Sequence, residues 1–213
     1  MERVAFKPNP SVSMISALLS TTYFGPLQWS QKLYRYESVV IDQQETFQKQ
    51  TYRNRCLIAT TQGVQALTVP VVHDASNAIR DIRISDHGNW RHLHWQALQT
   101  AYGDSPFFEY YEDDLRPFFT DRHWERLIDY NESIYQKMCE LLDIQPKIVQ
   151  SSCNHPLNLS DFRQGINPKH PFEDSDFQPR PYYQVYQQKY GFLPNLSILD
   201  LLFNMGPESI FYL

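Results

Sequence analysis

Residues 49–55, Lys-Gln-Thr-Tyr-Arg-Asn-Arg, form the most polar stretch of the chain and contain its first candidates for chemistry. Side chains alternate along an extended backbone, so Lys49, Arg53 and Arg55 would share one side of this stretch. A guanidinium group binds phosphate or carboxylate through two parallel hydrogen bonds. The pattern indicates an anion site, although a solvated loop explains the same charges. The candidate substrate-binding residues here are Lys49, Tyr52, Arg53, Asn54 and Arg55.

Two residues are candidates for a general base. Asp42 closes an apolar, β-branched stretch, and a carboxylate at the carboxyl end of a strand is well placed to act on a ligand. A turn cap accounts for Asp42 equally well. His94 follows Trp90 by four residues, so the two side chains share one face of a helix. We expect His94 and Asp42 as catalytic residues and Trp90 as a substrate-stacking ring, although such a histidine is more often structural.

Several known chemistries have no signature in the chain. It contains no P-loop, no GxGxxG, no HExxH and no GxSxG, and only 7 of its 213 residues are glycine. His92 and His94 would point apart on a helix, and the 3 cysteines, Cys56, Cys139 and Cys153, form no CxxC pair. We therefore expect no bound metal, no cofactor and no disulfide.

Composition narrows the class of protein. The chain has 19 Lys and Arg against 24 Asp and Glu, a formal net charge of −5. General nucleic-acid binders carry an excess of positive charge, so this class of partner is disfavoured. The first residues, Met-Glu-Arg-Val-Ala-Phe-Lys-Pro, lack the apolar core of a secretion signal, and no apolar run reaches the ~20 residues that span a bilayer. We expect a cytoplasmic protein without a membrane span.

The order of elements at the start of the chain predicts how these residues are positioned. A buried strand over 12–19, a turn at Gly25-Pro26, a helix over 27–36 and a strand over 38–42 make a parallel α/β unit. Parallel strands bring their carboxyl ends to one edge, where ligands bind. Tyr23, just after the first strand, therefore joins the candidate substrate-binding residues beside Asp42.

The rest of the chain predicts a single α/β domain over residues 1–213, with a mostly parallel or mixed central sheet flanked by helices. Ser197 and Asp200 have the spacing of a capping box, and Gly206-Pro207 stops the helix that they begin. A long loop rich in Pro and Asp is expected over 154–181. The other predicted elements are a hairpin of 56–60 and 65–72, a β-like stretch over 79–84, helices over 89–101 (capped by Asn89) and 121–143, and a strand over 147–151.

In their order, these pieces resemble the WbqC-like protein family. The resemblance rests on residues 49–55, Leu-Thr-Val-Pro-Val at 67–71, Ile-Arg-Asp-Ile-Arg-Ile at 79–84, Trp90 with His94, the aromatic stretch 102–111 and the tail 195–207. It runs from about residue 13 to the C-terminus. It implies a bacterial protein of O-antigen or other surface-polysaccharide synthesis, and a glycine or aminoacyl transfer onto a sugar. Many members carry Gln-Pro-x-Tyr and Pro-Trp near the first turn, where this chain has Ser-Thr-Thr-Tyr-Phe-Gly-Pro.

Three functions remain open. The leading hypothesis is an acyl or aminoacyl transferase that acts on a nucleotide- or lipid-linked sugar with an activated acyl donor. His94 or Asp42 would be its base, and Asn54 and Arg55 would hold the oxyanion or a phosphate. The second is a non-catalytic sugar- or nucleotide-binding or assembly protein of the same pathway, favoured by the missing compact motif. The third, nucleotidyl transfer, lacks a His-x-x-His pair in the first turn.

Overall fold

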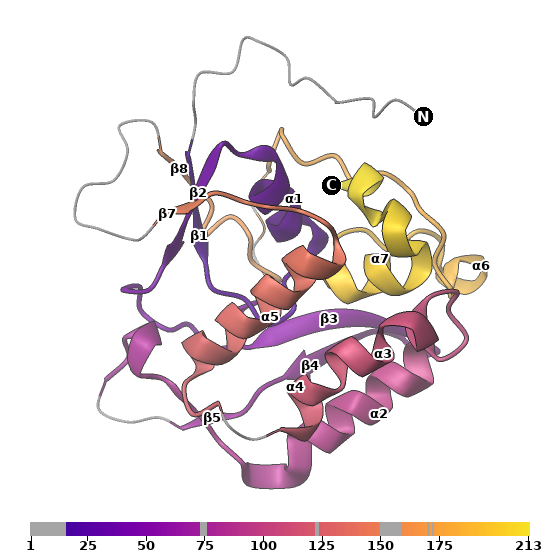
Figure 1. Ribbon diagram of the computed structural model, residues 1–213, viewed down its shortest axis with the longest axis horizontal. Helices are drawn as coiled ribbons and strands as arrows, with labels where there is room; N and C mark the ends of the chain where they lie inside the picture. Colours follow the sequence, from indigo (N-terminus) through magenta and orange to yellow (C-terminus); the bar gives the residue numbers. More distant parts are fainter. Residues whose placement is uncertain (1–15, 73–75, 122–123, 150–158, 170, 172) are drawn as a thin grey trace.

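The computed structural model describes residues 16–72, 76–121, 124–149, 159–169, 171 and 173–213. Its main sheet is parallel and four-stranded and lies at the left in Figure 1. The strand order is β7-β2-β1-β8. Strands β1 (Ser16–Ser20) and β2 (Ser38–Asp42) pair in parallel, and Ser20 is the partner of Asp42. Strands β7 (Ile148–Val149) and β8 (Leu159–Asp161) pair in parallel with β2 and β1. The α/β class and the shared carboxyl edge are therefore confirmed.

Helix α1 (Leu27–Arg35) connects β1 to β2 and begins where the sequence predicts it. The turn before α1 needs glycine, because a Cβ on Gly25 would lie 2.5 Å from Thr22 Oγ1. The helix buries even its lysine: Lys32 Nζ lies 2.8 Å from Asp174 Oδ2 and over the Phe162 ring, 4.7 Å from its centroid. These contacts bind the segment after β8 to α1.

The predicted hairpin is confirmed as β3 (Arg55–Thr60) and β4 (Gly63–Thr68), joined by a two-residue loop, but its second strand ends at Thr68 and not at residue 72. Beyond it, β5 (Val71–Val72) pairs with β6 (Arg83–Ile84). The β-like stretch predicted over 79–84 is wrong for its first half, where Ile79–Asp81 is a short 3-10 helix (η1). In η1 the Asp81 amide donates to the Ala78 carbonyl, so these residues turn back on themselves and do not extend.

Helices cover the remaining core and surround the hairpin (Figure 1). Among the described residues, no helix is long and apolar enough to cross a membrane. The helices are α2 (Trp90–Tyr102), α3 (Phe108–Leu115), α4 (Pro117–Thr120), α5 (Leu127–Leu141), α6 (Gln187–Tyr190) and α7 (Ile198–Met205), with 3-10 segments η2 (His87–Asn89) and η3 (Gly206–Tyr212).

Three element boundaries differ from the sequence prediction. Helix α5 begins at Leu127 and not at residue 121, because Arg126 is extended and the Leu127 amide donates to the Ile82 carbonyl. Asn89 adopts a left-handed conformation (φ 47°) and makes no capping hydrogen bond. The predicted loop over 154–181 contains strand β8, and its residues 154–158, 170 and 172 lie outside the described residues. Three residues are too few to show an alternating pattern, so the sequence conceals this strand.

The predicted capping box at α7 is half right. Ser197 Oγ accepts the Leu199 amide at 3.3 Å, but the Asp200 carboxylate does not turn back to the helix start. It lies in the core with no exposed surface and accepts three hydrogen bonds. The donors are Tyr102 Oη at 2.9 Å, Tyr182 Oη at 2.6 Å and Gln184 Nε2 at 2.8 Å. Asp200 thus joins α7, α2 and the segment before α6.

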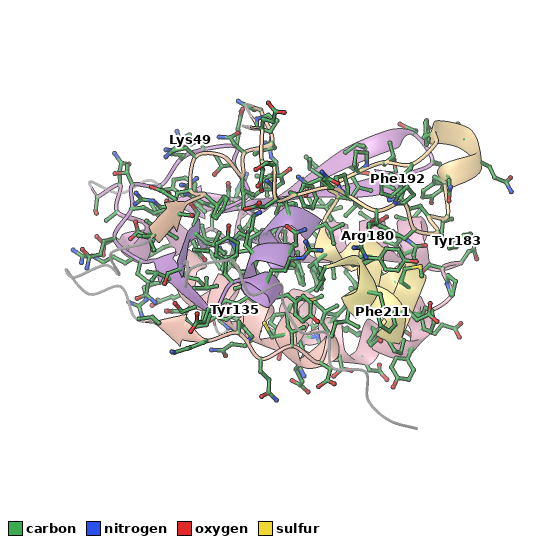
Figure 2. The ribbon with its side chains drawn as sticks, turned by 90° about the horizontal axis from the view of Figure 1, so that it is seen from above. Lys49, Tyr135, Arg180, Tyr183, Phe192 and Phe211 are labelled. Atoms are coloured by element: carbon green, nitrogen blue, oxygen red, sulfur yellow. The ribbon has the colours of Figure 1, made fainter. Side chains whose placement is uncertain are left out.

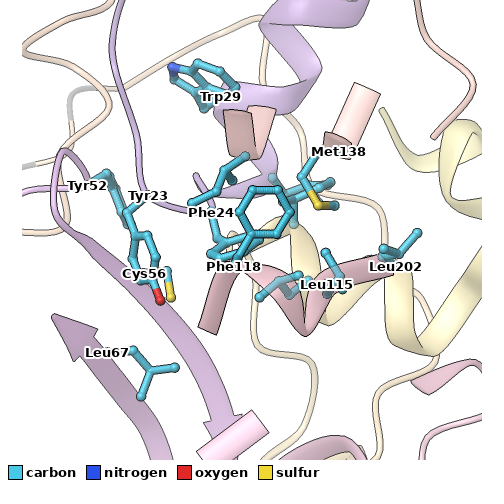
Figure 3. Close-up of a cluster of buried hydrophobic side chains, with 14 of the residues drawn as sticks. Tyr23, Phe24, Trp29, Tyr52, Cys56, Leu67, Leu115, Phe118, Met138 and Leu202 are labelled. Atoms are coloured by element: carbon cyan, nitrogen blue, oxygen red, sulfur yellow. The ribbon is translucent and has the colours of Figure 1, made fainter. Parts of the chain in front are cut away.

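Aromatic rings fill much of the space between the sheet, the hairpin and the helices (Figure 3). Phe24, in the turn between β1 and α1, stacks on Phe119 with ring centroids 5.8 Å apart. Tyr23 stacks on Tyr130 of α5 at 5.9 Å. Figure 3 shows the Tyr23 ring beside Cys56 of β3. The turn after β1 is therefore held by the core.

We predict that Asp200→Asn lowers the free energy of unfolding by roughly 1–3 kcal/mol, the cost of leaving a buried polar group unsatisfied. In the wild type both carboxylate oxygens accept: one from Tyr102, the other from Tyr182 and Gln184. In asparagine one of these two positions is an NH₂ group, which cannot accept from the donor that faces it. Urea denaturation measures the change. Asp104→Asn, at an exposed aspartate, is the control, and equal stability of the two variants would contradict the prediction.

Candidate functional site at the carboxyl edge of the sheet

The carboxyl ends of β1, β2 and β8 form one edge of the central sheet. β1 ends at Ser20, β2 at Asp42 and β8 at Asp161. The chain order changes direction at β1, with β2 and β7 on one side and β8 on the other. In open α/β sheets, ligands bind outside the carboxyl ends of the strands at such a switch point. This edge is therefore the candidate site.

An ion pair between β2 and the segment after β8 crosses this edge. Asp42 Oδ2 accepts from Arg163 Nη1 at 2.5 Å, and Asp42 Oδ1 accepts from the Gln44 amide at 2.8 Å. Arg163 also binds Asp161, with Nη2 2.6 Å from Oδ2. The hydrogen bonds to Asp161 and then Asp42 raise the pKa of Arg163 further, so the guanidinium is always charged. Its side chain remains 31% exposed, which leaves a cation within reach of an anionic ligand.

A second, buried ion pair lies behind the first. Arg53 Nε donates to Glu45 Oε1 at 2.9 Å, and Arg53 Nη2 donates to Ser20 Oγ at 2.8 Å. Ser20 Oγ in turn donates to Glu45 Oε2 at 3.0 Å. Burial raises the pKa of Glu45, while its hydrogen bonds to Arg53 and Ser20 oppose that rise. Arg53, only 2% exposed, therefore neutralises a carboxylate inside the protein and does not face solvent.

The stretch that contains the other expected cations is a turn. Gln50 has a positive φ of 61°, and Thr51 Oγ1 donates to the Gln48 carbonyl at 2.8 Å. The extended backbone that the sequence prediction assumed is therefore wrong before residue 55. Lys49 is exposed (Figure 2). The turn directs Lys49 outward and Arg53 inward, so they do not form one cationic face.

Asn54 and Arg55, where the turn meets β3, have separate neighbours. The Asn54 side chain is buried and donates through Nδ2 to the Val69 carbonyl at 2.8 Å. Arg55 is half-buried, and its Nε donates to Thr68 Oγ1 at 3.0 Å. Both contacts belong to the hairpin, so these two side chains hold β3 and β4 together.

His94 lies in a buried aromatic cluster. Its Nδ1 is 2.9 Å from Tyr23 Oη, and its ring centroid is 5.1 Å from that of Trp90. Burial lowers the pKa of His94 to about 4, although a hydrogen bond to the Thr68 backbone acts in the opposite direction. The imidazole is therefore neutral at pH 7 and has partners in Tyr23 and Thr68.

Tyr52 joins this cluster to the turn. Its carbonyl accepts the Tyr23 amide at 2.9 Å, and burial raises the pKa of its phenol to about 12. The structure thus separates the sequence candidates into two groups. Tyr23, His94 and Trp90 lie together in the core with Tyr52 beside them, whereas Asp42 lies at the sheet edge.

Sequence reasoning missed Ser20 and Arg163, and it assigned no role to Glu45. Glu45 follows Asp42 by three residues, so the strand prediction already placed it near the edge. Arg163 lies in a stretch that reads as loop, and no local signal links it to Asp42. Cys56 and Cys139 are buried free thiols, and Cys153 lies outside the described residues. No three His, Cys, Asp or Glu residues in the described ranges are grouped to hold a metal ion.

The low pKa of His94 predicts a pH dependence of stability. The folded protein holds the imidazole neutral down to a pH of about 4, whereas the unfolded chain takes up the proton near pH 6.5. The neutral His94 therefore does not reduce the free energy of unfolding above pH 6.5. As pH falls from 6.5 toward 4, the unfolded chain binds a proton that the folded protein does not, and the free energy of unfolding decreases by no more than about 1.4 kcal/mol per pH unit. Denaturation at pH 7, 6 and 5 should show a smaller loss in His94→Gln than in the wild type. The exposed His92→Gln is the control, and an identical slope in all three proteins would refute the assignment.

Comparison with known proteins agrees with the resemblance seen in the sequence. The chain is 28% identical over 203 residues to the uncharacterized protein Rv1507c of Mycobacterium tuberculosis, a match that covers 83% of this chain and 87% of the relative. No solved structure matches the chain. The model of the WbqC-like protein family matches residues 21–167 and 168–212, which include Asp42 and Arg163 of the sheet edge and the aromatic cluster. The protein therefore belongs to the WbqC-like protein family.

Proposed function

We propose that the protein acts in the synthesis of a bacterial surface polysaccharide, in the cytoplasm, as an acyl or aminoacyl transferase. Its substrates would be a nucleotide- or lipid-linked sugar and an activated acyl donor such as activated glycine. The observation that carries the proposal is the Asp42–Arg163 pair at the carboxyl edge of a parallel sheet. It combines a carboxylate that can accept a proton with a guanidinium that can bind a phosphate.

The proposed reaction uses these two groups in turn. The substrate phosphate binds the partly exposed Arg163 and competes with Asp42 for its hydrogen bonds. The released Asp42 carboxylate takes the proton from an amine or hydroxyl of the sugar as that group attacks the carbonyl carbon of the donor. The new bond to the acyl carbon forms, the bond to the donor's leaving group breaks, and the leaving group takes up the proton. Lys49, at the exposed turn, supplies further positive charge for the ligand.

The surroundings favour Asp42 over His94 as the base. A base must reach the proton that it removes. Both side chains are buried, but Asp42 lies at the edge of the sheet against the partly exposed Arg163, whereas His94 lies in the aromatic cluster and is already bonded to Tyr23. In this proposal His94 is a positioning residue, because it holds the Tyr23 side chain after β1.

A non-catalytic binding protein is the second candidate, and one observation favours it. Both oxygens of Asp42 accept hydrogen bonds, and Arg163 bridges two carboxylates. Arg163 could therefore exchange one of its two carboxylate partners for a ligand phosphate, and such an exchange binds the ligand without any reaction. Binding without product formation would distinguish this function from transfer.

We predict that Asp42→Asn lowers turnover about 10²-fold or more, since general-base catalysis contributes about 10²–10⁴. The assay incubates the protein with a panel of nucleotide sugars and activated glycine and follows product mass. Asp113→Asn, at an exposed aspartate of α3, should keep wild-type turnover. Full turnover of Asp42→Asn would remove Asp42 as the base. If deletion of the gene left the mass and composition of the surface glycan unchanged, the proposed pathway would be wrong.

We predict that Arg163→Ala weakens the binding of a nucleotide sugar by about 10- to 100-fold, which corresponds to roughly 1.5–3 kcal/mol for a charged hydrogen-bonded contact. Isothermal titration calorimetry measures the affinity. Arg180→Ala is the matched control, because Arg180 is exposed and lies far from Lys49 and the sheet edge (Figure 2). Equal affinities of the two variants would exclude Arg163 from the site.

A further inference from the structure

The outer edge of strand β4 has free backbone groups. β4 pairs with β3 on one side, and no strand of the described chain pairs with its other side. The two-residue loop closes on the Thr60–Gly63 pair, which in such hairpins is hydrogen-bonded. Bonded pairs alternate along an antiparallel ladder, so Val64 and Ala66 direct their N–H and C=O groups away from β3.

The other outward groups of the hairpin confirm this register. On β3, the Leu57 carbonyl accepts the Ser197 amide at 2.8 Å, and the Ala59 amide donates to Tyr102 Oη at 3.1 Å. The outer edge of β3 is therefore covered within the protein by Ser197 and Tyr102. On β4, the backbone of Thr68 hydrogen-bonds to His94. Within the described part of the chain, Val64 and Ala66 have no such partner.

β4 also lacks the usual protection of an edge strand. Proteins shield exposed edges with charged residues, proline or a bulge. The sequence of β4, Gly-Val-Gln-Ala-Leu-Thr, contains no charge and no proline, and it pairs with β3 residue by residue without a bulge. Val64 is 51% exposed. This edge is open to pairing with another strand.

The exposed face of α2, beside this edge, carries no formal charge. A surface helix normally places charged residues toward solvent. The one arginine of α2, Arg91, is buried and paired with Asp86, and Leu93 is 56% exposed. Depletion of charge is a property of protein–protein interfaces. The exposed positions of α2 are His92, Leu93, Gln96, Gln99 and Thr100.

A groove of about 750 Å³ separates the β4 edge from α2. It is open to solvent along the hairpin, and no Asp, Glu, Lys or Arg lines it. Each molecule carries a net charge of −5, so two copies repel each other over most of their surfaces. The uncharged groove and its two walls form the surface on which they can approach.

We propose that this surface, made of the β4 edge and the exposed face of α2, binds a second copy of the same chain. The open groups are self-complementary about Gln65. With two β4 strands antiparallel, Val64 of each copy faces Ala66 of the other, and each such pair exchanges two N–H···O=C bonds. The result is a four-stranded sheet of order β3-β4-β4-β3. Its two-fold axis places both α2 helices on one face of the sheet, where their Leu93 side chains are removed from water.

Sedimentation equilibrium of the full chain tests this proposal. The wild type should be a dimer, and Ala66→Pro should weaken dimerisation by about tenfold or more, as expected at the centre of an interface. Proline at 66 removes an outward N–H and leaves the β3–β4 ladder intact. Leu93→Glu, which introduces a charge on the α2 face, should have a similar effect. Tyr34→Glu is the control, because Tyr34 is also a large exposed side chain but lies on α1, outside the proposed surface. This variant should remain dimeric.

Amide hydrogen exchange gives a second, residue-level result that does not depend on the variants. The N–H groups of Val64 and Ala66 should be protected at high protein concentration and should exchange faster on dilution. A wild type that stays monomeric up to about 1 mM, a threshold for even weak association, would overturn the proposal. So would a dimer that Ala66→Pro and Leu93→Glu leave unchanged. A monomer whose Val64 and Ala66 amide signals shift with maltotetraose or with an uncharged extended peptide would assign the groove to that ligand and likewise overturn the dimer.

Discussion

The buried Asp200 carboxylate is the interaction on which much of the fold depends, because a carboxylate without solvent contact needs hydrogen-bond donors from the protein. Its three donors come from α2 and from the segment before α6, so three distant parts of the chain must meet at one point. Tyr102 extends the connection, because its hydroxyl also accepts the Ala59 amide of β3. Helix α7, α2 and the hairpin are therefore positioned together. Loss of one member of this network would leave its buried hydrogen-bond partners unsatisfied.

The same principle organises the candidate site. Arg53 is buried against Glu45 and Ser20, which fixes the turn over residues 49–54 beneath the carboxyl ends of β1 and β2. Because this arginine is neutralised internally, the accessible positive charge at the edge comes from Arg163, which is paired with the buried Asp42. The Arg53–Glu45 pair thus fixes the backbone around the site, and the partly exposed Arg163 is the side chain that a ligand can reach first.

The site and the proposed dimer surface differ in charge and are joined through α2. The sheet edge is polar and ionic, whereas the β4 edge and the exposed face of α2 are uncharged. His94 lies between them, since it contacts Tyr23 after β1 and the backbone of Thr68 at the end of β4. β4 is therefore linked to the turn after β1 through His94 of α2.

Local pattern in the sequence was sufficient for the elements that depend on near neighbours. The β-branched run 38–42, the turn at Gly25-Pro26 and the hairpin at 60–63 appear where they were predicted, because each depends on a few adjacent residues. Tertiary packing buries Arg53, turns the Asp200 side chain from the helix start into the core, and adds β8 to the sheet. It also brought Arg163 to Asp42 across 121 residues. Such contacts are made by segments that the fold brings together, so no spacing along the chain records them.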